Sequence, residues 1–150
     1  FGNSIKNNFK SFDLTTKNEN GLLGCAATND GYEKSFGCTH RREIYIDIEN
    51  NYLKGIDHIL KKKDGYPVRY SFRFHINPEL TVVKTMSGNG ALIQISKNKS
   101  LLFTINDENL ELEKSIFFAE KKILDSTCIT ITGNLVNKSK SFNWEIKKNI

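Results

Sequence analysis

The sequence predicts an all-β fold, an antiparallel β-sandwich of about ten strands. Apolar residues recur at every second position in segment after segment, which is the period of a strand with one buried face. Turn-forming Asn, Asp, Gly and Pro residues separate these segments at short intervals. The chain has 150 residues, 38% of them hydrophobic and 26% charged, which fits one globular domain with its own core.

The elements follow one another along the chain as short strands and turns. Residues 1–20 are polar and Asn-rich with little alternation, so we interpret them as a connecting segment, and residues 21–150 as the β-sandwich domain. The clearest strand patterns lie at 43–48, 68–77, 91–95, 101–105, 129–131 and 142–146. Between residues 108 and 122 the alternation fails, because Ile116-Phe117-Phe118-Ala119 is a continuous apolar run, and this stretch permits a short helix.

Charge alone does not identify a partner. The chain carries 22 basic and 17 acidic residues, a net charge of +5, but all the basic residues except the arginines at 41, 42, 69 and 73 are scattered lysines. We expect no nucleic-acid partner, because there is no basic stripe interleaved with aromatic residues and no recognised module. We expect no membrane partner either, because no apolar run approaches the roughly 18 residues of a membrane span.

Cysteine and histidine do not form a recognisable metal or redox pattern. The three cysteines, at 25, 38 and 128, are odd in number and lack a CxxC spacing, and the three histidines, at 40, 58 and 75, are far apart. We therefore expect no metal site and no cofactor, and we expect Cys25 and Cys38 to be small buried residues. Short catalytic and nucleotide-binding motifs are also missing.

One polar cluster lies where the segment Asn29-Asp30-Gly31-Tyr32 leads to His40-Arg41-Arg42 and the strand that follows. Alternation places His40 and Arg42 on the face of Ile44 and turns Arg41 to the other face. A guanidinium that starts on an apolar face must be paired or must reach the rim of the sheet.

Two interpretations of this cluster stay open. Arg42 forms a structural ion pair with Asp57 or Asp30, or it joins His40 and Tyr32 in a rim site for an anionic ligand.

A second polar cluster lies on the strand 68–77. Its outward side presents Arg69, Arg73 and His75 in a row, roughly 7 Å apart. Such a row suits contact with an acidic polymer, and it equally suits cross-strand pairing with acidic neighbours.

These pieces occur in an order that resembles a known family. They are Asn29-Asp30-Gly31-Tyr32, Phe36-Gly37, His40-Arg41-Arg42, Leu53-x-Gly55-x-Asp57 and Arg73-Phe74-His75-x-x-Pro78. Their order and spacing resemble the heparinase II/III-like family, specifically its C-terminal β-rich region, from about residue 20 to the closing Phe142-x-Trp144-x-Ile146 strand. Many relatives have His where this chain has Asn29. If that His contacts substrate in relatives, Asn29 keeps hydrogen bonding but loses proton transfer, and if the His is structural, the replacement changes little.

The resemblance implies a function for a longer parent protein. Family members are polysaccharide lyases with an α/α toroid followed by β-sandwich layers, and they cleave uronic-acid-containing polymers by β-elimination. Their catalytic Asn, His and Tyr correspond to positions upstream of residue 1, so we assign no catalytic residue here and expect the separate chain to be inactive. The implied partners are an acidic polysaccharide and the upstream toroid, and the implied location is the periplasm or cell surface.

Within this chain we expect the substrate to contact His40, Arg41, Arg42, Tyr32 and Arg73. The alternative is a non-catalytic sandwich that binds carbohydrate or packs against another domain. A carbohydrate-binding module requires exposed aromatic rings, for example Tyr45, Tyr52 or Tyr66 in one plane, or Trp144 on the exterior.

Overall fold

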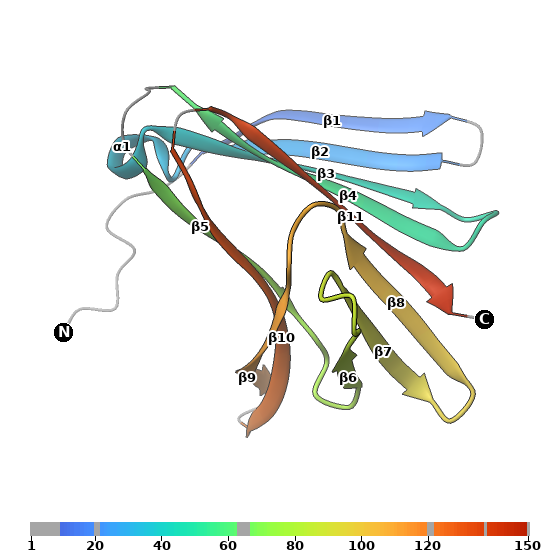
Figure 1. Ribbon diagram of the computed structural model, residues 1–150. Coiled ribbons are helices and arrows are strands. Elements are labelled where there is room, and N and C mark those ends of the chain that lie inside the picture. The colour runs from blue at the N-terminus through green and yellow to red at the C-terminus, as the bar shows by residue number, and fades with distance from the viewer. Residues whose placement is uncertain (1–9, 20–21, 63–66, 120–121, 137, 150) are drawn as a thin grey trace.

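The computed structural model describes residues 10–19, 22–62, 67–119, 122–136 and 138–149 (Figure 1). Those segments contain eleven strands and one short helix. In chain order they are β1 (Ser11–Glu19), β2 (Leu22–Asn29), α1 (Glu33–Phe36), β3 (Cys38–Asp47), β4 (Tyr52–Lys61), β5 (Val68–His75), β6 (Thr81–Lys84), β7 (Gly90–Ser96), β8 (Lys99–Ile105), β9 (Glu111–Ala119), β10 (Lys122–Leu135) and β11 (Lys140–Asn149).

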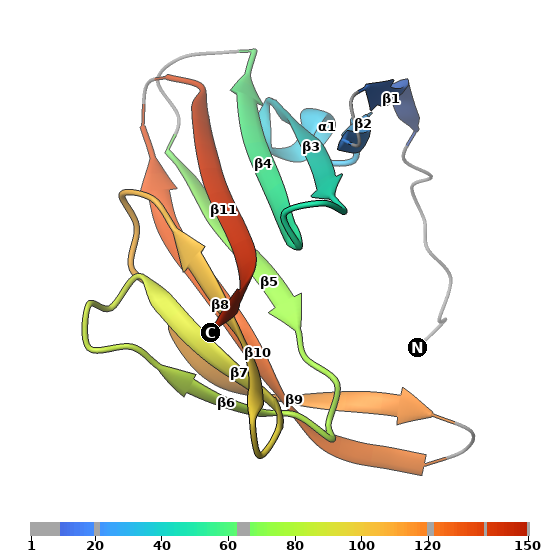
Figure 2. The same cartoon turned by 90° about the vertical axis from the view of Figure 1, so that its right-hand side faces the viewer.

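The strands form two antiparallel sheets, which confirms the predicted fold class. The large sheet has eight strands in the order β1-β2-β3-β4-β11-β8-β7-β6, and the small sheet has three in the order β5-β10-β9. The two sheets face each other across the core (Figure 1). The small sheet has fewer strands, so the strands at the margin of the large sheet extend past it (Figure 2).

Two segments differ from the sequence-based expectation. The described part of the expected connecting segment forms β1, which pairs with β2 at the edge of the large sheet. The short helix permitted near residue 116 is wrong, because that run lies in β9 and pairs with β10, with Phe118 opposite Ile123 and Phe117 opposite Leu124. Both faces of that hairpin carry apolar side chains, which removes the alternation by which a strand is recognised.

Aromatic side chains from both sheets fill the core. Phe72 of the small sheet packs on Phe142 of the large sheet with ring centroids 4.9 Å apart, and Phe74 packs on Trp144 at 5.0 Å. Trp144 has this place because β4 carries Gly55 opposite it. A Cβ atom at Gly55 would lie 1.9 Å from the indole ring, so only glycine fits there.

The cysteines are free thiols in two environments. Cys38 is buried, as expected for a small apolar residue, and Cys128 is buried as well. Cys25 is exposed, so the expectation of burial is wrong for it. It lies on β2, opposite Ile44, in the part of the large sheet near its β1 edge.

Candidate functional site

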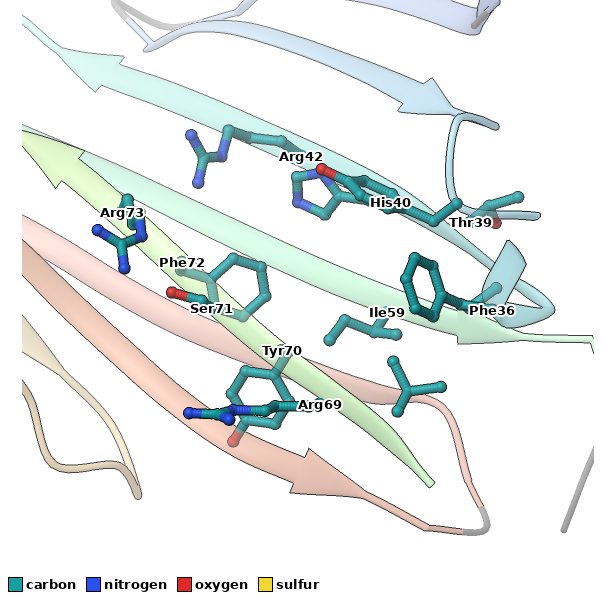
Figure 3. Close-up of a pocket in the computed structure, with 13 residues that line it drawn as sticks. Phe36, Thr39, His40, Arg42, Ile59, Arg69, Tyr70, Ser71, Phe72 and Arg73 are labelled. Carbon is teal, nitrogen blue, oxygen red and sulfur yellow. The ribbon is translucent and has the colours of Figure 1, made fainter. Parts of the chain in front are cut away.

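A pocket of about 380 Å³ lies beside the start of β3 and along β5. Its lining comes from four places: the helix α1 with the residue before it, the first half of β3, Ile59 of β4, and β5 from Val68 to Arg73 (Figure 3). Because β5 is an edge strand of the small sheet, the side of β5 away from β10 has no neighbouring strand among the described residues.

The pocket brings together four of the five residues predicted to contact substrate. Tyr32, His40, Arg42 and Arg73 all line it. The fifth, Arg41, does not. Alternation correctly turned Arg41 to the opposite face of β3, where its Nε donates to Glu43 at 3.1 Å.

Tyr70 and Ser71, which were not among the residues predicted from the sequence, line the pocket together with Arg69 (Figure 3). Tyr70 is a core residue by alternation, and its hydroxyl reaches Glu108 at 3.2 Å. Burial and the nearby Glu108 carboxylate raise the pKa of Tyr70 to about 12, so it stays a neutral phenol at physiological pH.

A buried carboxylate holds two of the pocket side chains in place. Asp57 of β4 is fully buried and lies opposite Arg42 in the β3–β4 register. Arg42 donates to both of its oxygens, from Nε at 2.7 Å and from Nη2 at 3.0 Å, and His40 Nε2 lies 2.6 Å from Oδ1. The indole Nε1 of Trp144 donates to Oδ2 at 2.8 Å. Of the two partners proposed for Arg42, Asp57 is therefore the correct one.

This network keeps Asp57 ionised. Burial alone would raise its pKa, but the hydrogen bonds from His40 and Arg42, the Arg42 charge and the Trp144 hydrogen bond together hold the pKa below its ordinary value. An ionised carboxylate only accepts hydrogen bonds, so Nε2 of His40 carries the proton that faces Asp57.

Arg42 keeps part of its binding capacity for a ligand. Its Nε and Nη2 are used by Asp57, and no described residue accepts a hydrogen bond from its Nη1. The guanidinium lies over the rings of Phe74 and Trp144, 5.3 and 5.9 Å from their centroids. Such stacking fixes the plane of the group while its side chain remains partly exposed.

The outward row on β5 exists as predicted, and two of its members have partners. Arg73 Nη1 lies 3.0 Å from Glu113 of β9, and His75 Nδ1 lies 2.9 Å from the hydroxyl of Ser115. The Arg73–Glu113 pair is solvent-exposed, and such pairs contribute little, so a ligand carboxylate or sulfate can replace Glu113 at small cost.

The Asn29–Tyr32 segment acts as a turn. Asn29 Oδ1 accepts a hydrogen bond from the Gly31 amide at 2.7 Å, and the Asp30 carboxylate accepts one from the Lys10 amide at 2.6 Å. The turn leads into α1, where Tyr32 and Phe36 sit with ring centroids 6.5 Å apart on the pocket lining. The observed contact of the Asn29 side chain is thus one that shapes the turn.

Within the described segments, no group of three or more His, Cys, Asp or Glu side chains is arranged to hold a metal ion. The same segments contain no helix with the length and apolar character needed to cross a membrane.

The two-sheet arrangement is that of the solved heparan sulfate lyases, which defines the class of fold. A heparan sulfate lyase from Pedobacter heparinus matches with a TM-score of 0.76 and 14% identity, over 93% of this chain and 22% of that chain. A heparinase III structure matches with a TM-score of 0.68 and 15% identity, over 93% of this chain and 21% of that one. The chain therefore spans about a fifth of the length of these structures.

The sequence itself matches the heparinase II/III-like, C-terminal family over residues 4–145. The chain belongs to that family, which confirms the resemblance seen in its ordered motifs. No curated protein matches the sequence.

Proposed function

We propose that this chain is the C-terminal β-sandwich of a polysaccharide lyase that cleaves uronic-acid-containing polysaccharide by β-elimination. In this proposal the sandwich supports an upstream catalytic toroid and forms one wall of the substrate cleft. The observation that carries the proposal is the pocket lined by Arg42, Arg69 and Arg73 in a chain of the heparinase II/III-like family.

The pocket suits the binding part of such a reaction. Elimination next to a uronate needs the carboxylate charge offset, a base for the C5 proton and an acid for the leaving oxygen. Guanidinium groups offset carboxylate and sulfate charge through paired N–H donors. His40 is held by Asp57 and we assign it to substrate positioning, while the base and acid come from the upstream domain.

Binding of an uncleaved oligosaccharide tests the proposal. Calorimetry with a heparan sulfate oligosaccharide at fixed ionic strength measures the affinity of the chain and of Arg73→Ala. We expect the variant to bind about fivefold more weakly, the effect of roughly 1 kcal/mol for one exposed charged contact.

The matched control is Lys54→Ala, which removes the same charge from an exposed position on β4 outside this pocket. Its affinity should stay within about twofold of the unmodified chain, because long-range charge effects are screened by salt. Equal losses in Arg73→Ala and Lys54→Ala would show general attraction of a polyanion to a basic protein and would contradict a specific site.

The alternative of a non-catalytic carbohydrate-binding module has less support. Trp144 is 5% exposed and lies in the core, so it offers no external platform. Tyr45 is partly buried and donates its hydroxyl to Glu43 at 2.5 Å. Tyr66 lies outside the described residues.

A further inference from the structure

Two parts of the sandwich project to the same side (Figure 2), and each carries exposed apolar side chains. The first, the wing, is the core-facing side of the large sheet at β2 and the second half of β3, bordered by Thr16 and Asn18 of β1. The second, the ribbon, is the end of the β9–β10 hairpin, residues 114–119 and 122–127. We propose that the wing and the ribbon together dock the polypeptide that precedes this chain in the longer lyase, which places an apolar element between them.

The wing is apolar although no described residue covers it. Leu23 pairs with Ile46 and Cys25 with Ile44 across β2 and β3, so the four side chains share one face. Ile44 packs against the core, which identifies this face as the core-facing one. Leu23 and Ile46 are nevertheless 38% and 43% exposed, and Cys25 is exposed as well. The four side chains line a shallow groove of about 360 Å³, and Thr16 and Asn18 form its β1 side.

The ribbon is apolar for a matching reason. From Lys122 to Thr127, β10 pairs only with β9, because its pairing with β5 begins at Cys128. Ile116, Phe118 and Ile123 share the face of the core residue Ile129, yet they are 54%, 71% and 66% exposed. Lys114 and Asp125 are the charged residues on this face of the ribbon. A two-stranded ribbon is marginal in water by itself, and a cluster of large exposed apolar side chains marks an interaction site.

One occupant accounts for both surfaces. Each surface continues the core-facing side of its own sheet, so an element placed between them would be buried on both sides and would extend the existing core. The longer polypeptide is the occupant that the comparisons favour, because the matched family is a C-terminal one and the solved relatives are far longer than this chain. This inference rests on the proposed function, which places a further domain upstream.

Cys25 reports directly on whether the wing is covered. In the separate 150-residue chain a thiol reagent should modify Cys25 and spare the buried Cys38 and Cys128. In the longer protein Cys25 should react roughly tenfold or more slowly, located by peptide mass spectrometry, because only local opening would expose it. As a control, a cysteine placed at Lys54 should react equally in both proteins, since Lys54 is exposed on the opposite face of β4.

Equal reactivity of Cys25 in the two proteins would overturn the inference. So would protection of Cys25 in the separate chain that grows with concentration, because the occupant would then be a second copy. Neither result depends on substrate or turnover, so the docking inference and the proposed lyase function can fail independently.

A ribbon variant tests the second surface. Phe118→Asp should leave the unfolding midpoint of the separate chain unchanged, since the side chain is exposed, but it should restore Cys25 reactivity in the longer protein. Val83→Asp is the matched control, because Val83 is an exposed apolar residue of β6, at the opposite edge of the large sheet from β1. Full protection of Cys25 in the Phe118→Asp protein would remove the ribbon from the docking site.

Discussion

Replacing Asp57 by Asn tests the account of how the pocket is held. Asn has nearly the same shape as Asp, but it carries no charge and presents an NH2 group where the structure requires an acceptor. Asp57 is fully buried and accepts from Arg42, His40 and Trp144. The variant therefore turns at least one of these contacts into a donor facing a donor.

The magnitude follows from the partners. Breaking a buried ion pair by removing one member costs about 3–5 kcal/mol, because the other charge is left without a partner. Arg42 is partly exposed and water can reach it, which lowers the cost. We therefore expect Asp57→Asn to reduce the free energy of unfolding by about 3 kcal/mol, most of it from lost charge-assisted hydrogen bonds.

Urea unfolding followed by tryptophan fluorescence measures this loss. Trp144 is the single tryptophan and donates to Asp57, so its emission reports on the same cluster. Asp125→Asn is the control, because Asp125 is exposed on β10 and its replacement should change stability by less than about 0.5 kcal/mol. If Asp57→Asn costs no more than this control, the carboxylate does not organise the pocket and the reasoning is refuted.

Three further outcomes follow from the same structure. The pKa of Asp57 is lowered in the fold, so the contribution of its carboxylate to stability is present at neutral pH and is lost as the pH falls through about 4 and below. In urea titrations, the difference in unfolding free energy between the unmodified chain and Asp57→Asn should therefore narrow between pH 7 and pH 3. A constant difference would contradict the lowered pKa of Asp57. Gly55→Ala places a methyl group 1.9 Å from the Trp144 ring, so we expect a loss of about 3 kcal/mol in urea unfolding and a shifted Trp144 emission; an unchanged midpoint would mean that the indole does not lie over Gly55. The pKa of Tyr70 is raised to about 12, so the contribution of its neutral phenol to stability is full below pH 10 and is lost as the pH rises toward 12. Over that range the unfolding free energy of Tyr70→Phe should fall less than that of the unmodified chain. Equal losses would show that Tyr70 ionises as freely in the folded chain as in the unfolded one.

The alternation of apolar residues was sufficient to predict the sheets that have one buried face. It also placed Arg42 inward and Arg41 outward. Of the two aspartates named as possible partners of Arg42, the structure confirms Asp57. The alternation rule holds for these residues because β3 and β4 each have one side that faces the core and one that faces solvent.

Alternation could not predict β1 or β9. The signal depends on a contrast between a buried face and a wet face. The exposed side chains of β1 face solvent on both sides, and the ribbon end of β9 carries apolar side chains on both sides. The ribbon, whose apolar residues on both faces prevented the prediction of β9, is also one of the two surfaces for which we infer a partner.

The pocket was predicted only in part because it joins segments that are distant in the sequence. Nothing local to β5 shows that Phe72 lies beside the His40 ring, with centroids 5.7 Å apart. Trp144 as a donor to Asp57 was also missed. Its one sequence signal was Gly55, two residues before Asp57 in a strand, since glycine in a strand often marks a close approach by another group.

Unsaturated-uronate absorbance tests most directly whether this chain supports a reaction centre supplied by the preceding polypeptide. The separate 150-residue chain and the longer protein would each be mixed with heparan sulfate and with a second uronate polymer, under conditions where the chain's fold is verified by Trp144 emission. We expect a steady rise in absorbance with the longer protein and none with the separate chain. Turnover by the separate chain would place base and acid within these residues and would contradict the division of roles.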